Sequence, residues 1–202
     1  MKLLYATGNE NKYQLMKRRL KDIKDVEVIM PKYINIKIDV KEDGNTAEEN
    51  AIKKAKAYYE VTKLTTIAED SGLWVEKFSE EEQPGLFVKR VNGREDLSDE
   101  QILDFYIEKL NRIGGKSNAR YITGIALINE KGEVFSKTIE EELFIMTIDR
   151  NDKEYISGGF LDVISYDPIS NKYFNELNDE EKSKRYDIID KEIRNIIKEI
   201  LK

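Results

Sequence analysis

Short apolar runs alternate with helical patterns along the first third of the chain, and this alternation limits the possible folds more than any other feature. Residues 2–6 and 26–30 have strand character, whereas residues 10–22 and 46–61 carry apolar side chains at helical spacing. A further apolar run at residues 65–68 ends the series. Strands that alternate with helices are typical of α/β proteins, so we expect a β-sheet flanked by helices.

The middle of the chain predicts a different layout. Ser98 is placed to cap a helix over residues 98–110, and two segments with strand character follow at 119–129 and 134–148. A Glu-Lys-Gly-Glu turn separates these two segments, and the second one is either a single long strand or two strands. We therefore expect a meander inserted into the α/β layout.

The C-terminal tail, residues 179–201, has the pattern of one amphipathic helix. Its buried stripe is predicted to consist of isoleucines, namely Ile188, Ile189, Ile193, Ile196, Ile197 and Ile200. The chain of 202 residues contains no internal repeat and no low-complexity linker, and its length is sufficient for a sizeable core. We expect residues 1–202 to form a single domain.

The charge balance and the missing residue types exclude several classes of protein. The net charge of −6 argues against a protein that holds a nucleic-acid backbone through clustered Lys and Arg. The chain has no cysteine and no histidine, so a metal would be a hard cation held by oxygen, Mg²⁺ or Mn²⁺. A general base would be a carboxylate, a lysine or a tyrosine. Because neither a signal peptide nor a membrane span is recognisable, we expect a cytoplasmic protein without a membrane partner.

The first stretch that suggests chemistry joins the first predicted strand to the first predicted helix. It consists of Thr7, Gly8, Asn9, Glu10, Asn11 and Lys12. A strand that leads through a glycine turn into a helix presents free backbone N–H groups and the positive end of the helix dipole to an anion. The alternative is an ordinary strand–turn–helix connection in which Asn9 is the N-cap.

The second stretch, Glu69-Asp70-Ser71-Gly72, follows the apolar run at residues 65–68. Two acids at the end of a strand are suited to hold Mg²⁺ and to activate water. Adjacent residues of an extended chain point to opposite faces, so we expect only one of the two acids to enter the site. The alternative is a turn with solvated acids.

The third stretch combines Glu42-Asp43-Gly44 with the helix that follows it. In this helix Glu49 and Lys53 share one face, and so do Asn50 and Lys54, because each pair is four residues apart. Such a face can place a metal-binding carboxylate beside a phosphate-binding lysine, or it can be a solvated, salt-bridged surface. Taken together, the three stretches suggest binding or hydrolysis of a phosphorylated small molecule, and the missing G-x-x-x-x-G-K-[ST] run excludes a standard P-loop.

The order of these motifs resembles the inosine triphosphate pyrophosphatase family, which hydrolyses non-canonical purine nucleoside triphosphates to the monophosphate and pyrophosphate. The chain has ATGNENK for the family's A-T-G-N-x-x-K, EENAIKKAKA for E-N-A-x-x-K-A, and AEDSGLWVE for E-D-[ST]-G-L-x-V-[ED]. Further along it has PGLFVKRVNG for P-G-x-Y-S-A-R-Y-x-G, ARYITGIAL for the A-x-F/Y strand, YDPI for [FY]-D-P-I-F, and ELNDEEKS for E-[ML]-x-x-E-E-K-[NS]. The resemblance therefore covers nearly the whole chain.

The resemblance implies roles for the matching residues on the phosphate side. The stretch from Thr7 to Lys12 would hold the triphosphate, and Ser71 would contact the substrate. Glu42 and Asp70 would position Mg²⁺, with Glu49 and Asn50 supporting the metal site. Asp70 would also activate the attacking water, and Lys54 would neutralise the phosphates.

On the nucleoside side, the resemblance implies that Tyr166 and Asp167 bind the nucleoside and that Lys182 lies at the base. Here the chain also departs from the family, which follows E-E-K-[NS] with S-H-R to recognise the 6-keto purine. The chain has Tyr-Asp-Ile at residues 186–188 instead. Arg185 either replaces the missing arginine in a shifted loop or is a solvated charge on a helix. In the P-G loop, Val88 stands where serine is usual.

We therefore expect an Mg²⁺-dependent pyrophosphatase of nucleoside triphosphates, acting on non-canonical purines such as ITP, dITP and XTP. The alternatives are a nucleotide-binding or sensing module with lost or altered catalysis, and a pyrophosphatase for a different base. We also expect a long twisted mixed β-sheet flanked by helices, with two lobes around a central cleft, and the resemblance implies a homodimer.

Overall fold

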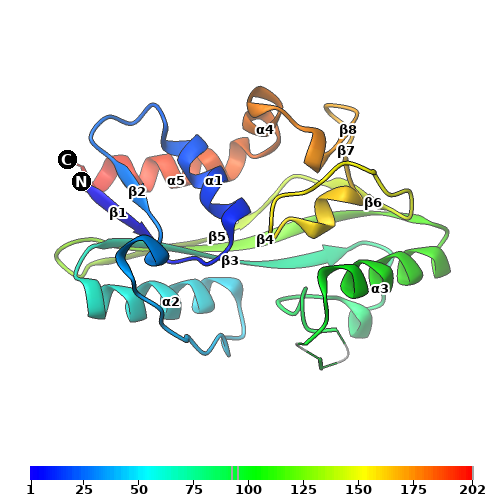
Figure 1. Ribbon diagram of the computed structural model, residues 1–202, viewed down its shortest axis with the longest axis horizontal. Helices are drawn as coiled ribbons and strands as arrows, with labels where there is room; N and C mark the ends of the chain where they lie inside the picture. Colours follow the sequence, from blue (N-terminus) through cyan, green and yellow to red (C-terminus); the bar gives the residue numbers. More distant parts are fainter. Residues whose placement is uncertain (92, 95, 202) are drawn as a thin grey trace. The chain divides into compact units, whose positions relative to one another are not determined.

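The predicted alternation of strands and helices is present in the structure, a computed structural model that describes residues 1–91, 93–94 and 96–201 (Figure 1). The chain forms two units, each with its own hydrophobic core. The first unit contains residues 1–71, 122–140 and the chain from 187 onward, and the second contains residues 72–121 and 141–186.

Among the described residues, five strands of an eight-stranded sheet form the centre of the first unit. They follow the order β2-β1-β3-β4, and β5 pairs with β4. Strand β1 pairs in parallel with both β2 and β3, and β5 is antiparallel to β4. The bounds of these strands are β1 Lys2–Tyr5, β2 Glu27–Ile29, β3 Thr65–Val75, β4 Lys116–Ile128 and β5 Val134–Glu140. The predicted mixed sheet is therefore confirmed.

Helices cover both faces of this sheet. Helices α1 (Glu10–Leu20) and α5 (Asp187–Ile200) lie on one face, and α2 (Ala47–Thr62) lies on the other (Figure 1). Ala51 and Ala55 of α2 are fully buried, and these small side chains let the helix pack closely on the sheet. A short 3₁₀ helix, Pro31–Ile34, follows β2.

The start of α2 contains one half of a capping box. The side chain of Thr46 accepts a hydrogen bond from the N–H of Glu49 (3.1 Å), as expected of an N-cap. The carboxylate of Glu49, however, accepts from the N–H of Asn45 (2.8 Å), one residue before the cap. Glu49 therefore stabilises the helix start through its backbone contacts.

The second unit is built around the other ends of β3 and β4. Its remaining elements are α3 (Asp99–Arg112), β6 (Phe144–Thr147), β7 (Ser165–Asp167), β8 (Lys172–Tyr173), α4 (Asp179–Arg185) and the 3₁₀ helices Glu80–Glu82, Phe160–Val163 and Phe174–Glu176. Strand β6 is antiparallel to the first residues of β4 and to β7. The predicted cap of α3 is confirmed, since Ser98 and Gln101 form a reciprocal capping box. Fully buried residues such as Leu103 and Phe144 form the core of this unit.

The structure corrects or decides three expectations about secondary structure, of which the third concerns the tail. The run at residues 65–68 is not a short strand, because β3 continues through the acids to Val75. The segment 134–148 is two strands, since β5 pairs with residues 122–128 of β4 and β6 pairs with residues 116–119.

The tail is two helices instead of one. The backbone leaves the helical conformation at Tyr186, whose N–H bonds to the carbonyl of Lys182 at the end of α4. Of the predicted stripe, Ile189, Ile193 and Ile197 are buried, whereas Ile188 is 41% exposed. Among the described residues, no helix is both long enough and apolar enough to cross a membrane. The predicted cleft between two lobes stays a prediction.

Candidate active site

The order of the strands in the first unit indicates the carboxyl end of β1 as the place where a ligand is expected to bind. From β1 the chain passes through α1 to β2 on one side, and it then returns through α2 to β3 on the other side of β1. In open sheets with parallel strands, ligands bind where successive connections leave in opposite directions. The residues after Tyr5 therefore lie at the position where a ligand is expected.

The predicted phosphate turn, residues 7–12, occupies this position. The Oγ1 atom of Thr7 accepts from the N–H of Asn9 (3.1 Å), and the Oδ1 atom of Asn9 accepts from the N–H of Lys12 (3.1 Å). Asn9 is therefore the N-cap of α1, as the local alternative also predicted. The first turn of α1 contains Glu10 and Asn11, which are both partly buried. The N-terminal end of α1 thus lies at the carboxyl end of β1.

The space beside Gly8 is open, whereas Glu10 is held in an ion pair. Gly8 is exposed, its φ lies outside the left-handed region, and a Cβ there would meet no atom within 4 Å. Neither the backbone nor packing requires a glycine, and the space beside it is open. Glu10 pairs with Lys32 (2.7 Å), and the hydrogen bond from this lysine lowers the pKa of the Glu10 carboxyl.

The two acids of β3 point to opposite faces of the sheet, as predicted. Glu69 accepts a hydrogen bond from Arg19 of α1 (2.9 Å), whereas Asp70 accepts one from Asn50 of α2 (2.9 Å). Ser71 follows the alternation back to the α1 face, where its hydroxyl lies 3.3 Å from the ammonium of Lys12. Only Asp70 therefore reaches the helix that carries the predicted metal and phosphate residues.

Asn50 connects Asp70 to the loop before α2. Its side chain is nearly fully buried, its Oδ1 atom accepts from the N–H of Gly44 (2.7 Å), and its Nδ2 atom donates to Asp70. One helical turn further, Lys54 forms an ion pair with Glu42. The structure thus contains two pairs of these side chains, Asn50 with Asp70 and Lys54 with Glu42, whose helical members are one turn apart on α2.

The oxygen ligands of this group fit a magnesium ion in part. No group of three or more acidic side chains that could hold a metal occurs among the described residues. Mg²⁺ is commonly held by only one or two carboxylates together with substrate phosphates, and Glu42 and Asp70 supply carboxylates of this kind. Glu49 does not contribute in this arrangement, because its carboxylate bonds to the backbone of Asn45.

The residues predicted to bind the nucleoside lie in the second unit. The ring of Tyr166 packs edge-on against Tyr173 at 5.4 Å between centroids. Asp167 is fully buried, and its Oδ2 atom accepts from the N–H of Ser170 (2.9 Å), which stabilises the turn between β7 and β8. Lys182 is partly exposed, and its ammonium has no hydrogen-bond or ion-pair partner in the part of the chain that the structure describes.

Arg185 is not the solvated helix charge that one alternative predicted. It is 2% exposed, and its guanidinium donates to the carbonyls of Glu142 (2.6 Å) and Leu143 (3.2 Å). The guanidinium carbon also lies 5.4 Å and 5.0 Å from the ring centroids of Phe144 and Phe174. That alternative placed the end of α4 in solvent, but it packs against the aromatic core of its unit. Arg185 therefore holds α4 in place.

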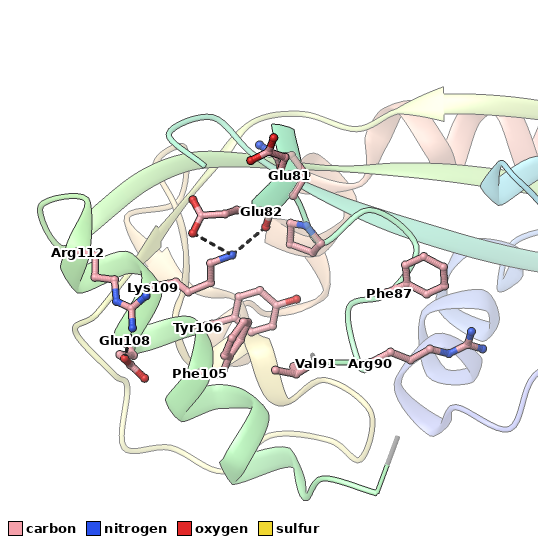
Figure 2. Close-up of a pocket in the computed structure, with 12 residues that line it drawn as sticks. Glu81, Glu82, Phe87, Arg90, Val91, Phe105, Tyr106, Glu108, Lys109 and Arg112 are labelled. Atoms are coloured by element: carbon pink, nitrogen blue, oxygen red, sulfur yellow. Dashed lines mark hydrogen bonds and ion pairs between the residues drawn. The ribbon is translucent and has the colours of Figure 1, made fainter. Parts of the chain in front are cut away.

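A cavity of about 500 Å³ lies elsewhere in the second unit, between the P-G loop and α3 (Figure 2). Phe87 and Tyr106 line it, and its basic side chains are engaged. Lys109 donates to the carbonyl of Glu82 (2.9 Å). Figure 2 shows this contact at the wall of the cavity. Asn92 of the P-G motif lies outside the described residues.

Two features of the first unit were not predicted from the sequence. Arg19 is buried in ion pairs with Glu69 and Asp190, which are far from it in the chain. Gly124 of β4 faces the start of α2 so closely that a Cβ there would lie 2.1 Å from the backbone nitrogen of Glu48. A glycine inside an apolar strand is a known indication of such a close backbone approach, so this second feature had a signal in the sequence.

The fold and the site define an α/β protein in which the N-terminus of α1 lies where the connections between the parallel strands leave β1 in opposite directions. Residues 3–187 match the model of the Ham1 family, and the chain belongs to this family. This confirms the resemblance to inosine triphosphate pyrophosphatases. The dITP/XTP pyrophosphatase of Aquifex aeolicus is 36% identical over 196 residues, covering 91% of this chain and 89% of that protein.

Other relatives agree with this assignment. The dITP/XTP pyrophosphatase of Borrelia duttonii is 34% identical over 195 residues, which cover 90% of this chain and 88% of that protein. Among solved structures, a HAM1 protein from Coxiella burnetii superposes with a TM-score of 0.73 at 24% identity, covering 98% of this chain and 99% of the other. The Staphylococcus aureus Ham1 protein gives a TM-score of 0.67 at 25% identity, covering 96% and 99%. The predicted fold class is confirmed.

Proposed function

We propose that the protein hydrolyses nucleoside triphosphates to the monophosphate and pyrophosphate, with non-canonical purines such as ITP, dITP and XTP as substrates. The names of its curated relatives support this activity. The observation that carries the proposal is the contact between two parts of one site. Lys12 of the phosphate turn meets Ser71 at 3.3 Å, and the next residue, Asp70, is held by Asn50 at 2.9 Å.

The turn at residues 7–12 binds the triphosphate. The N-terminal end of α1 lies at this turn, and the positive end of the helix dipole attracts phosphate oxygens. Lys12 adds a positive charge, and the open space beside Gly8 leaves room for a phosphate to approach the backbone. The side chains of Thr7 and Asn9 fix the conformation of the turn through their hydrogen bonds to the backbone.

Asp70 is the general base in this proposal. Its carboxylate accepts a proton from the attacking water as the bond to pyrophosphate breaks. The amide of Asn50 orients the carboxylate, and this amide is itself oriented by its bond to Gly44. Lys54 neutralises phosphate charge once a triphosphate competes with Glu42 for its ammonium. Mg²⁺, held by Glu42 and Asp70 when bound, would neutralise further negative charge on the triphosphate.

Fewer residues support the proposal for nucleoside binding. The ammonium of Lys182, which is unpaired among the described residues, can donate to a keto oxygen of a purine, whereas the guanidinium of Arg185 already donates to backbone carbonyls. We therefore propose that Lys182 recognises the purine base without a second basic side chain from residues 186–188. The preference for particular purine bases is then broader than in members with S-H-R. Tyr166 and Asp167 as nucleoside-binding residues, the homodimer and the cytoplasmic location stay predictions.

A substrate panel tests the proposed function. The protein is incubated with Mg²⁺ and, separately, ITP, dITP, XTP, dUTP or a standard nucleoside triphosphate, and released pyrophosphate is measured. We expect release from the 6-keto purines in particular. If no nucleotide releases pyrophosphate, the proposed activity is wrong.

The second candidate function is a nucleotide sensor without catalysis. The replacement of S-H-R by Tyr-Asp-Ile at residues 186–188 favours it, since this change affects the part of the family pattern that reads the base. Calorimetry with the same nucleotides separates the two functions. Tight binding without turnover supports the sensor, whereas turnover of a bound nucleotide excludes it.

A further inference from the structure

The first unit contains a buried group of charged side chains that the proposed mechanism does not use. Arg19 donates from Nη1 to Oε1 of Glu69 (2.9 Å) and from Nε to Oδ1 of Asp190 (2.7 Å). Arg18 donates to the other oxygen of Asp190 (2.6 Å). None of these side chains is more than 11% exposed. Two positive and two negative charges are therefore balanced away from solvent.

The members of this group belong to the elements that carry the proposed site. Arg19 is on α1, whose first turn follows the phosphate turn. Glu69 immediately precedes Asp70 in β3. Tyr5, the last residue of β1, is buried beside the same charges, and burial together with the Glu69 carboxylate raises the pKa of its hydroxyl well above the ordinary value. The group thus connects the strand before the phosphate turn, the helix after it and the strand of the general base.

Stability alone does not explain such a group. Burying ion pairs has a large desolvation cost, and replacing them by apolar side chains is often neutral or stabilising. Their best attested use is to fix the register of packed elements. If α1 moved by one residue along β3, at least one buried charge would lose its partner. The ion pairs therefore favour a single register of α1 on the sheet.

We propose that Arg19 is a positioning residue for the hydrolytic reaction and that it acts through Glu69. This inference rests on the proposed function. By holding Glu69 on the α1 face of β3, Arg19 holds the next residue, Asp70, on the opposite face, where Asn50 bonds to it. The same guanidinium fixes α1 and so keeps Lys12 beside Ser71. One buried cation then sets the geometry between the phosphate turn and the general base.

The variant Glu69→Gln tests this role, because it keeps the size of the side chain and removes its charge. Ile197→Ala is the matched control, since Ile197 is fully buried on α5 and its truncation destabilises the same unit without touching the site. We expect Glu69→Gln to lower kcat about ten- to a hundredfold with KM changed less than about threefold. The control should lower Tm and leave kcat unchanged when both are assayed well below their Tm.

Two kinetic results would overturn the inference. One is a kcat for Glu69→Gln equal to that of Ile197→Ala. The other is full recovery of Glu69→Gln activity at high Mg²⁺, which would make Glu69 a metal ligand. If Glu69→Gln does not fold, Arg19→Lys takes its place, because an ammonium lacks the planar arrangement of donors through which Arg19 bonds to both carboxylates. We expect Arg19→Lys to lower kcat in the same direction.

Hydrogen exchange separates failure of this inference from failure of the proposed function. Without substrate, the amides of residues 68–71 should exchange about tenfold faster in Glu69→Gln than in the wild-type protein, because β3 has lost its buried anchor. Ile197→Ala should change exchange mainly in α5. A wild-type protein without turnover refutes the proposed function only, whereas unchanged exchange at residues 68–71 in Glu69→Gln overturns the positioning role.

Discussion

An alanine at position 124 would displace the start of α2, because β4 and α2 approach each other there through backbone atoms. A Cβ on Gly124 would lie 2.1 Å from the nitrogen of Glu48 and 2.3 Å from the carbonyl carbon of Ala47. Ordinary contact begins at 3.4 Å, so strand and helix would have to separate by ~1.3 Å. No flexible side chain can absorb this displacement.

The displacement would reach the site through Asn50, one turn into the helix. Its 2.9 Å hydrogen bond to Asp70 would be stretched beyond hydrogen-bonding distance by such a movement. The bonds from Ser136 (2.7 Å) and Thr138 (2.6 Å) to the carboxylate of Glu48 would be strained as well. Overpacking of this kind costs about 1–3 kcal/mol, which corresponds to a fall in Tm of about 2–12 °C at this chain length. Misplacement of Asp70, the proposed general base, by about 1 Å can lower kcat about a hundredfold.

Thermal unfolding followed by circular dichroism and a pyrophosphate-release assay measure the two effects. Gly8→Ala is the matched glycine-to-alanine control for stability, since a Cβ on Gly8 meets no atom within 4 Å. We expect Gly8→Ala to keep the wild-type Tm while raising KM, because the methyl group occupies the space proposed for a phosphate. If Gly124→Ala has the wild-type Tm and kcat, the packing of α2 on β4 does not position Asp70.

Three further outcomes are expected. Lys54→Ala should raise KM about tenfold with little change in kcat, since a charge-assisted contact to phosphate is lost; an unchanged KM would remove Lys54 from the site. Lys182→Ala should weaken nucleotide binding measured by calorimetry without lowering Tm, whereas Arg185→Met should lower Tm; the reverse pattern would contradict their assigned environments. Tm should be nearly constant from about pH 5 to 9 and fall outside this range. Hydrogen bonds from two lysines lower the pKa of Asp43 to about 2, so its stabilising effect is lost as the pH falls below about 4. Burial raises the pKa of Tyr106, so the contribution of its neutral hydroxyl to the stability of the folded protein is lost as the pH rises above about 10. A Tm that falls between pH 5 and 9 would contradict these assignments.

The sequence predicted best what depends on neighbouring residues. The alternation of strands and helices, the N-cap at Asn9 and the opposite orientation of Glu69 and Asp70 all follow from local patterns, and the structure contains them. The length of β3 was predicted wrongly because two acids and a glycine in succession usually mark the end of a strand. In this protein the strand continues, since one acid is neutralised by Arg19 and the other bonds to Asn50.

Contacts between distant parts of the chain could not be predicted in this way. Arg19 pairs with Asp190 across 171 residues, and nothing in the local sequence of either residue indicates burial. Arg185 follows two basic residues in a helix rich in charge, a pattern typical of an exposed surface. Its burial depends on Phe144 and Phe174, which form the pocket for its guanidinium only in the folded unit.

The products formed from dITP decide whether this protein is a pyrophosphatase that uses Asp70 as its base. Wild-type protein and Asp70→Asn are incubated with dITP and Mg²⁺, the products are separated by ion-exchange chromatography, and Tm is measured for both proteins. We expect the wild-type protein to form dIMP and pyrophosphate in equal amounts, and Asp70→Asn to form neither while keeping its Tm within a few degrees. Intact dITP with the wild-type protein, or full turnover by Asp70→Asn, would contradict the proposed mechanism.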